Sequence, residues 1–206
     1  MKVRIVKRGT TLFEILVVFA ILALLMIVTY PVIKTQITKA LDARVKADLY
    51  KIKINLEIYY SLAEQFPREL PACGQPLAYQ EQVILASIPC NPITKTSYIY
   101  QTKTGDPQSY RLYALLSNSL DPSIEKAGCL GGCGPNCFFN YGVSSMNIGL
   151  VKCSYVCAPG NGGCEKYQDA DLSLCPKKYF LDSTCNSECG QPQNRCQNAS
   201  GKYIPY

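Results

Sequence analysis

The chain has 206 residues, enough for one domain of ordinary size or for a small domain with appendages. Its net charge is +6, but four of the positive charges lie within the first eight residues, so the remainder lacks the basic patch that nucleic-acid binding requires. It contains no histidine, which excludes Ser-His-Asp and Cys-His catalysis. We find no other catalytic constellation, and we therefore expect neither an enzyme nor a nucleic-acid partner.

The basic head is followed by an apolar run, residues 15–28, in which every side chain is apolar. Counted through Leu12 and Phe13 on one side and to Ile33 on the other, the run is about 20 residues long, which is enough to cross a bilayer core. Basic residues before such a segment stay on the cytoplasmic side. The pattern predicts a single-pass cell-membrane protein with its N-terminus in the cytoplasm and its C-terminal part in the periplasm or on the cell surface of a bacterium.

Other N-terminal signals fit this region less well. The residues after the run, Thr29, Tyr30 and Pro31, make a poor cleavage site for a secretory signal, and the cysteine that a lipoprotein signal needs is missing. A plain signal anchor fits the hydropathy equally well. The residues before the run decide between these alternatives.

Those residues, KRGTTLFE at positions 7–14, resemble the prepilin peptidase site of the type IV pilin family. The resemblance implies a leader peptide of residues 1–9, cleavage between Gly9 and Thr10, and methylation of the new N-terminus at Thr10. Phenylalanine is the common residue at that place, so Thr10 departs from the family pattern. The resemblance also implies that Glu14 acts in assembly by pairing with the N-terminal ammonium of a neighbouring subunit.

The same resemblance implies a set of partners. These are other pilin or pseudopilin subunits, contacted through the N-terminal helix, together with prepilin peptidase, an inner-membrane assembly platform, and membrane lipid before assembly. A carboxylate such as Glu14 at the edge of an apolar segment is expensive and is functional by default, which agrees with this interpretation.

Helical periodicity continues past the apolar run. Apolar residues recur at spacings of three or four from Ile33 to Ala63, which predicts one helix over residues 10–63, about 80 Å long, with its membrane part at about 11–33. Pro31 resembles the helix-breaking proline of pilins and predicts a kink. We expect the apolar stripe to face the protein's own domain and the polar face to be solvated. That polar face comprises Lys39, Asp42, Lys46, Lys53 and Glu57.

Residues 64–122 are expected to form a globular, pilin-like part. The segments 97–102 and 109–116 are rich in Tyr, Ile and Leu and flank a turn-forming cluster, which predicts a β-hairpin. Proline-bearing loops and tyrosine strands here resemble a major pseudopilin of type II secretion. Such proteins often bind calcium, for which Asp106, Asp121, Asp169 and Asp171 are candidate ligands. No calcium-loop spacing is present, so we predict no cofactor, with calcium as the one candidate.

Residues 123–206 form a cysteine-rich extension in which apolar periodicity disappears, and we expect it to be mostly irregular. High cysteine density indicates disulfide bonds in an oxidising compartment. Zinc is the rival, but Cys-x2-Cys pairs are absent. We predict a Cys73–Cys90 pair and leave the other pairings open. A glycosylation sequon at Asn198 carries little weight. The disulfide candidates are Cys73, Cys90, Cys129, Cys133, Cys137, Cys153, Cys157, Cys164, Cys175, Cys185, Cys189 and Cys196.

The sequence therefore predicts an α+β protein with a long, membrane-inserted N-terminal helix packed on a small antiparallel sheet, followed by a disulfide-rich tail. The predicted function is a structural subunit of a type IV pilus-like filament or secretion pseudopilus, processed by prepilin peptidase. The alternative is a signal-anchored, cysteine-rich surface binding or adhesion protein that does not assemble. The sequence leaves open which machine the filament serves.

Overall fold

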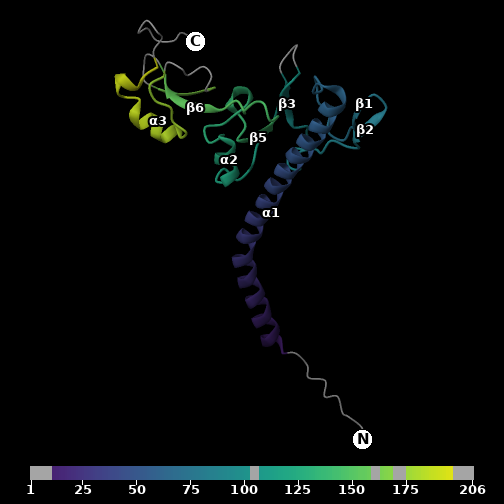
Figure 1. Cartoon of the computed structure of the whole chain (residues 1–206). Helices are drawn as coiled ribbons and strands as arrows, with labels where there is room; N and C mark the ends of the chain where they lie inside the picture. The colour runs from purple at the N-terminus through teal and green to yellow at the C-terminus, as the bar shows by residue number, and fades with distance from the viewer. Residues whose placement is uncertain (1–10, 103–106, 159–162, 169–174, 197–206) are drawn as a thin grey trace. The chain divides into compact units, whose positions relative to one another are not determined.

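The structure is a computed structural model that describes residues 11–102, 107–158, 163–168 and 175–196. It divides into two compact units, residues 1–40 and 41–206, and the division falls within the first helix. Helix α1 spans Leu12–Ala63 and continues through Pro31 (Figure 1). It ends at Ala63, the last residue of the predicted helix.

The predicted membrane insertion of residues 11–33 is wrong. Within the described ranges, none of the helices combines the length and the apolar character that a membrane crossing requires. The uninterrupted apolar run has only 14 residues, about 21 Å of helix, whereas a bilayer core is about 30 Å thick. The prediction reached the full length only by counting across Glu14 at one end and across polar residues at the other.

The core of the second unit lies between the second half of α1 and a three-stranded antiparallel sheet in the order β3-β4-β5. Strands β3, Ile99–Thr102, and β4, Tyr110–Ala114, form the predicted hairpin, with Ile99 opposite Tyr113. Strand β5, Tyr141–Ser144, pairs with the other edge of β4. From α1, the residues Val45, Leu49, Ile52 and Leu56 are fully buried in this core.

The sequence placed a boundary between residues 122 and 123, but the core extends past that point. Helix α2, Pro122–Ala127, contributes Ile124, and the following loop contributes Cys129 and Cys133. Strand β5 belongs to the central sheet although it lies beyond residue 122. The first part of the cysteine-rich extension is therefore packed into the same core as α1 and the central sheet.

The tail, which we predicted to be mostly irregular, contains several short regular elements. After β5 the chain forms the antiparallel hairpin of β6, Cys153–Cys157, and β7, Cys164–Gln168, followed by α3, Asp182–Glu188. Short 3-10 turns lie at Pro135–Cys137 and Pro192–Asn194. A second small hairpin, formed by β1, Leu77–Tyr79, and β2, Gln82–Leu85, follows α1. These elements have three to seven residues, too few to produce a readable hydrophobic period.

Candidate functional site

Residues 15–27 of α1, in the first unit, are all apolar and exposed. Exposed large apolar side chains follow one another at nearly every position rather than in one stripe. A helix that is apolar all round is normally covered by other protein or by lipid. The most exposed of the large apolar side chains in this unit are Leu12, Phe13, Leu24, Met26, Ile27 and Tyr30.

The part of α1 in the second unit has two apolar faces, of which the sequence reasoning recognised one. The buried face packs into the core, as described above. A second row recurs every four residues and remains exposed, at Tyr50, Ile54, Ile58 and Leu62. At about 3.6 residues per turn this row lies on the side of the helix opposite the core. This second row can also be read from the sequence, but the first apolar stripe alone was enough to explain how the helix packs on its own domain.

Three acidic side chains of α1, Asp42, Asp48 and Glu57, accept hydrogen bonds from the sheet and its loops. We expected Asp42 and Glu57 to be solvated and made no prediction for Asp48. Asp42 is 1% exposed, and its carboxylate accepts hydrogen bonds from the backbone amides of Ser117 and Asn118, each at 2.8 Å. This corrects its predicted place on the solvated face. The position lies at the edge of the buried stripe, where a short carboxylate can reach the loop that follows β4.

Two buried tyrosines bind the other acidic side chains. The Tyr98 hydroxyl donates to the carboxylate of Asp48 at 2.9 Å. The Tyr110 hydroxyl donates to the carboxylate of Glu57 at 3.3 Å. Burial raises the pKa of each tyrosine, and the neighbouring carboxylate raises it further. Both tyrosines therefore remain protonated donors across the neutral range.

Lys46, also predicted to be solvated, is half-buried and lies 2.7 Å from the carboxylate of Asp121. Asp121 is the N-cap of α2 and accepts from the backbone amide of Ser123. The hydrogen bonds from Lys46 and Ser123 lower the pKa of Asp121 to about 2. This candidate calcium ligand is thus already engaged by protein groups. The other candidates, Asp106, Asp169 and Asp171, lie outside the described residues, as does the sequon at Asn198.

The predicted processing site, Gly9 and Thr10, lies outside the described residues. Glu14 is in the first turn of α1, and its backbone amide donates a hydrogen bond to the Thr11 hydroxyl oxygen at 3.3 Å. The Glu14 side chain is exposed. An acidic residue in the first turn also interacts favourably with the helix dipole. This position stabilises the helix start and leaves the carboxylate accessible to a partner.

All twelve cysteines lie among the described residues, and they form six disulfides. The predicted Cys73–Cys90 pair is confirmed, with its Cα atoms 4.8 Å apart. It closes the segment that carries the β1–β2 hairpin. The other five pairs are Cys129–Cys133, Cys137–Cys153, Cys157–Cys189, Cys164–Cys185 and Cys175–Cys196.

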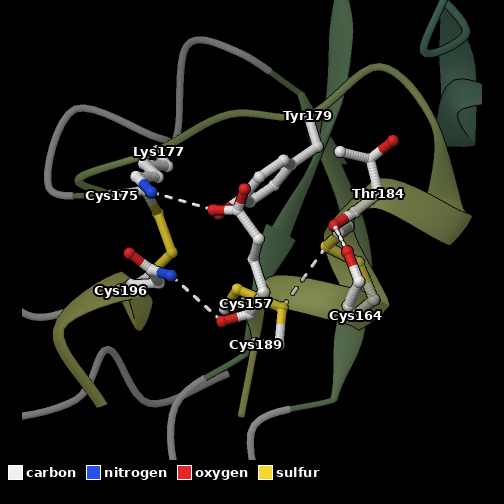
Figure 2. Close-up of a disulfide and its surroundings, with 12 residues drawn as sticks. Cys157, Cys164, Cys175, Lys177, Tyr179, Thr184, Cys189 and Cys196 are labelled. Atoms are coloured by element: carbon white, nitrogen blue, oxygen red, sulfur yellow. Dashed lines mark hydrogen bonds and ion pairs between the residues drawn. A yellow bond between two sulfur atoms is a disulfide. The ribbon is translucent and has the colours of Figure 1, made fainter. Parts of the chain in front are cut away.

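Two of these disulfides meet at the junction of the β6–β7 hairpin and α3 (Figure 2). Cys157 and Cys164 occupy opposite positions in the hairpin register. Cys185 and Cys189 are four residues apart along α3 and its C-cap, with their Sγ atoms 3.5 Å apart. Tyr179 packs against this group and donates to Glu188, which also pairs with Lys177 at 2.8 Å. The spacing of the cysteines along the chain does not predict this four-sulfur cluster, because the pairing depends on the hairpin register.

Comparisons of the chain with protein-family models, with curated proteins and with solved structures find no match.

Proposed function

We propose that this protein is a structural subunit of an extracytoplasmic, type IV pilus-like filament, in which copies pack together through α1. The observation that carries the proposal is the amount of exposed apolar surface on that helix. Over residues 15–27 the helix is apolar all round, and in the second unit it adds the row Tyr50, Ile54, Ile58 and Leu62. A monomer gains nothing from holding such side chains in water.

The partner that fits this surface is a second copy of the same chain. Helices that bury apolar residues on more than one side pack with several neighbours, as in the core of a helical assembly. A head-to-tail contact between identical subunits that does not close into a ring produces a filament. An open helical array therefore covers every copy except those at its ends.

The residues that resemble the prepilin site would fix how each copy is aligned with its neighbour in the filament. Cleavage after Gly9 would remove the basic head and create an ammonium group at Thr10. Glu14 follows four residues later, with its side chain exposed. A carboxylate and an ammonium group that are surrounded by apolar side chains attract each other strongly, provided that they pair in the assembled state. We propose that Glu14 pairs with the N-terminus of a neighbouring copy.

The location outside the cytoplasm is proposed from the disulfides. Six disulfides in a chain of 206 residues are typical of proteins that mature in an oxidising compartment. The cysteine-rich region would then be the part of the subunit that the filament displays.

The experiment compares two Ile→Glu variants of the full chain expressed in a cell that makes such filaments. Ile54 is 46% exposed on the outer row of α1, and Ile93 is 41% exposed in the loop between β2 and β3. Sheared surface fractions are then examined by electron microscopy and immunoblotting. We expect Ile54→Glu to abolish filaments and Ile93→Glu to leave them intact, with the two monomers equally stable. Filaments in normal number from Ile54→Glu would refute the assembly surface.

The processing step has its own test. The N-terminal mass of the recovered protein should correspond to a chain that starts at Thr10, and Gly9→Val should retain residues 1–9. Glu14→Ala should be processed normally but fail to assemble. A wild-type chain that keeps residues 1–9 in a peptidase-competent cell would show that the motif is accidental.

A further inference from the structure

The four cysteines at the junction of the β6–β7 hairpin and α3 converge more closely than two separate staples require. The Sγ atoms of Cys157, Cys185 and Cys189 all lie within 4.8 Å of one another. Cys164 is bonded to Cys185, which brings a fourth sulfur to the same place. Cys157, Cys185 and Cys189 are buried, and Cys164 is partly exposed at the edge.

We propose that, when these two disulfides are reduced, Cys157, Cys164, Cys185 and Cys189 form a tetrahedral four-thiolate site for a thiophilic divalent cation, with Zn²⁺ as the preferred ion. Structural zinc sites use four such ligands at about 2.3 Å, which places the sulfurs about 3.8 Å apart in a tetrahedron. The 3.5 Å separation of the Cys185 and Cys189 sulfurs is close to that spacing.

The hairpin, α3 and its C-cap already bring the four ligands to one place. Two ligands come from facing positions of a β-hairpin and two from consecutive turns of a helix, with three residues between them. A spacing of two to four residues between paired ligands is usual for structural zinc. The same four sulfurs would thus hold the hairpin against α3 in either state, by disulfides when oxidised and by the metal when reduced.

Formation of the metal site takes two steps, reduction of the two disulfides and binding of the metal. A small-molecule thiol reduces both disulfides: four thiol molecules are oxidised to two disulfides, and four cysteine thiols form. One Zn²⁺ then replaces the four thiol protons, which leave to water, and the oxidation state of the metal does not change. Because thiolates are the ligands, the affinity should fall as the pH is lowered. The partly exposed Cys164 gives the external thiol its point of entry.

The test is zinc protection against alkylation, mapped by peptide mass spectrometry. The full chain is reduced in a thiol buffer, with or without one equivalent of Zn²⁺, then treated with iodoacetamide and digested. We expect Zn²⁺ to slow alkylation of these four cysteines and to leave the other eight as reactive as without metal. Protection of none, or equal protection of all twelve, would overturn the proposal.

Variants separate a built site from adventitious thiol binding. Cys164→Ser removes one of the four ligands, and Cys73→Ser removes a cysteine from a disulfide outside the cluster. The probe is Co²⁺, whose thiolate charge-transfer and tetrahedral ligand-field bands report the number of bound sulfurs. We expect Cys164→Ser to weaken Co²⁺ binding by more than about 100-fold, since loss of a ligand costs more than loss of an outer-shell partner. Cys73→Ser should bind as the parent does, and equal loss in both variants would refute the site.

Discussion

The ammonium group of Lys46, on α1, lies 2.7 Å from the carboxylate of Asp121, which caps α2. One acidic side chain therefore performs two tasks. It satisfies the backbone amide of Ser123 at the start of α2, and it fixes that start against the long helix. The two contributions can be separated because asparagine is nearly as good an N-cap as aspartate but carries no charge.

We expect Asp121→Asn to lower the free energy of unfolding by less than about 1 kcal/mol, because only the ion pair is lost. Asp121→Ala should lower it by about 1–2 kcal/mol, because the cap is lost as well. Urea titration of each variant measures the difference. If both substitutions had the same effect, the capping bond would make no contribution.

The same carboxylate predicts a pH dependence. The hydrogen bonds from Lys46 and Ser123 lower the pKa of Asp121 from 3.8 to about 2. A group whose pKa is lower in the folded state stabilises the fold above its unfolded pKa, and this stability is lost as the pH falls toward the folded pKa. We therefore expect wild-type stability to fall between about pH 4 and pH 2, by about 1 kcal/mol more than that of Asp121→Asn, after allowance for solvent screening. Parallel curves for the two proteins across this range would contradict the pairing.

Asp42 is expected to contribute more than Asp121. Its buried carboxylate accepts two backbone hydrogen bonds at 2.8 Å. Asp42→Ala would leave the amides of Ser117 and Asn118 without that acceptor, at a cost of about 2–3 kcal/mol in unfolding free energy. Lys39→Ala, at an exposed position of the same helix, is the control and should change stability by less than about 0.5 kcal/mol. Similar small effects from both substitutions would show that the loop finds other partners.

The residues of α1 show where prediction from sequence succeeds and where it stops. Of the predicted stripe, the residues Val45, Leu49, Ile52 and Leu56 are buried, whereas Ile33 and Ile37 at its start are exposed. The helix ends at Ala63, the predicted last residue. Both features are local. Asp42 was assigned to solvent because a carboxylate without a visible partner is normally exposed, and its partners lie 75 and 76 residues further along the chain.

The cysteines show the same limit. Cys73 and Cys90 could be paired because they are separated from the others in the sequence. The pairing of Cys157 with Cys189 and of Cys164 with Cys185 depends on the register of β6 and β7 and on the position of α3. None of these was expected in a tail whose short elements have no hydrophobic period. Cysteine supplies many of the buried side chains there, and a pattern based on aliphatic residues does not detect it.

The Cys73–Cys90 disulfide should stabilise the segment after α1. It links residues 17 apart, and its loss on replacement of both cysteines by serine should cost about 3 kcal/mol of unfolding free energy. The backbone amide of Cys73 donates to the Ser97 hydroxyl, so the serine variant keeps that contact. Thermal unfolding monitored by circular dichroism measures the loss. An unchanged midpoint would show that the segment is already ordered by Leu77, Leu85 and Ile88, which are buried in the core.

Tyr98 predicts how the protein responds to alkali. It is buried and donates to Asp48, and burial raises its pKa well above the ordinary value of 10.0. For a group whose pKa is raised by folding, the stability is fully present below the unfolded pKa and is lost as the pH rises above it, because the unfolded chain ionises first.

Tyr98→Phe should be about 1 kcal/mol less stable than wild type at neutral pH, since Asp48 loses its donor. Above about pH 10 its stability should decline less steeply, so that the two curves converge. Tyr50→Phe is the matched control, because Tyr50 is 61% exposed on α1, the helix that carries Asp48, and its loss should change the free energy of unfolding at neutral pH by less than about 0.5 kcal/mol. Urea unfolding at a series of pH values measures the stability of all three proteins. If the curves of Tyr98→Phe and wild type run parallel in alkali, Tyr98 ionises in the folded protein as readily as in the unfolded chain.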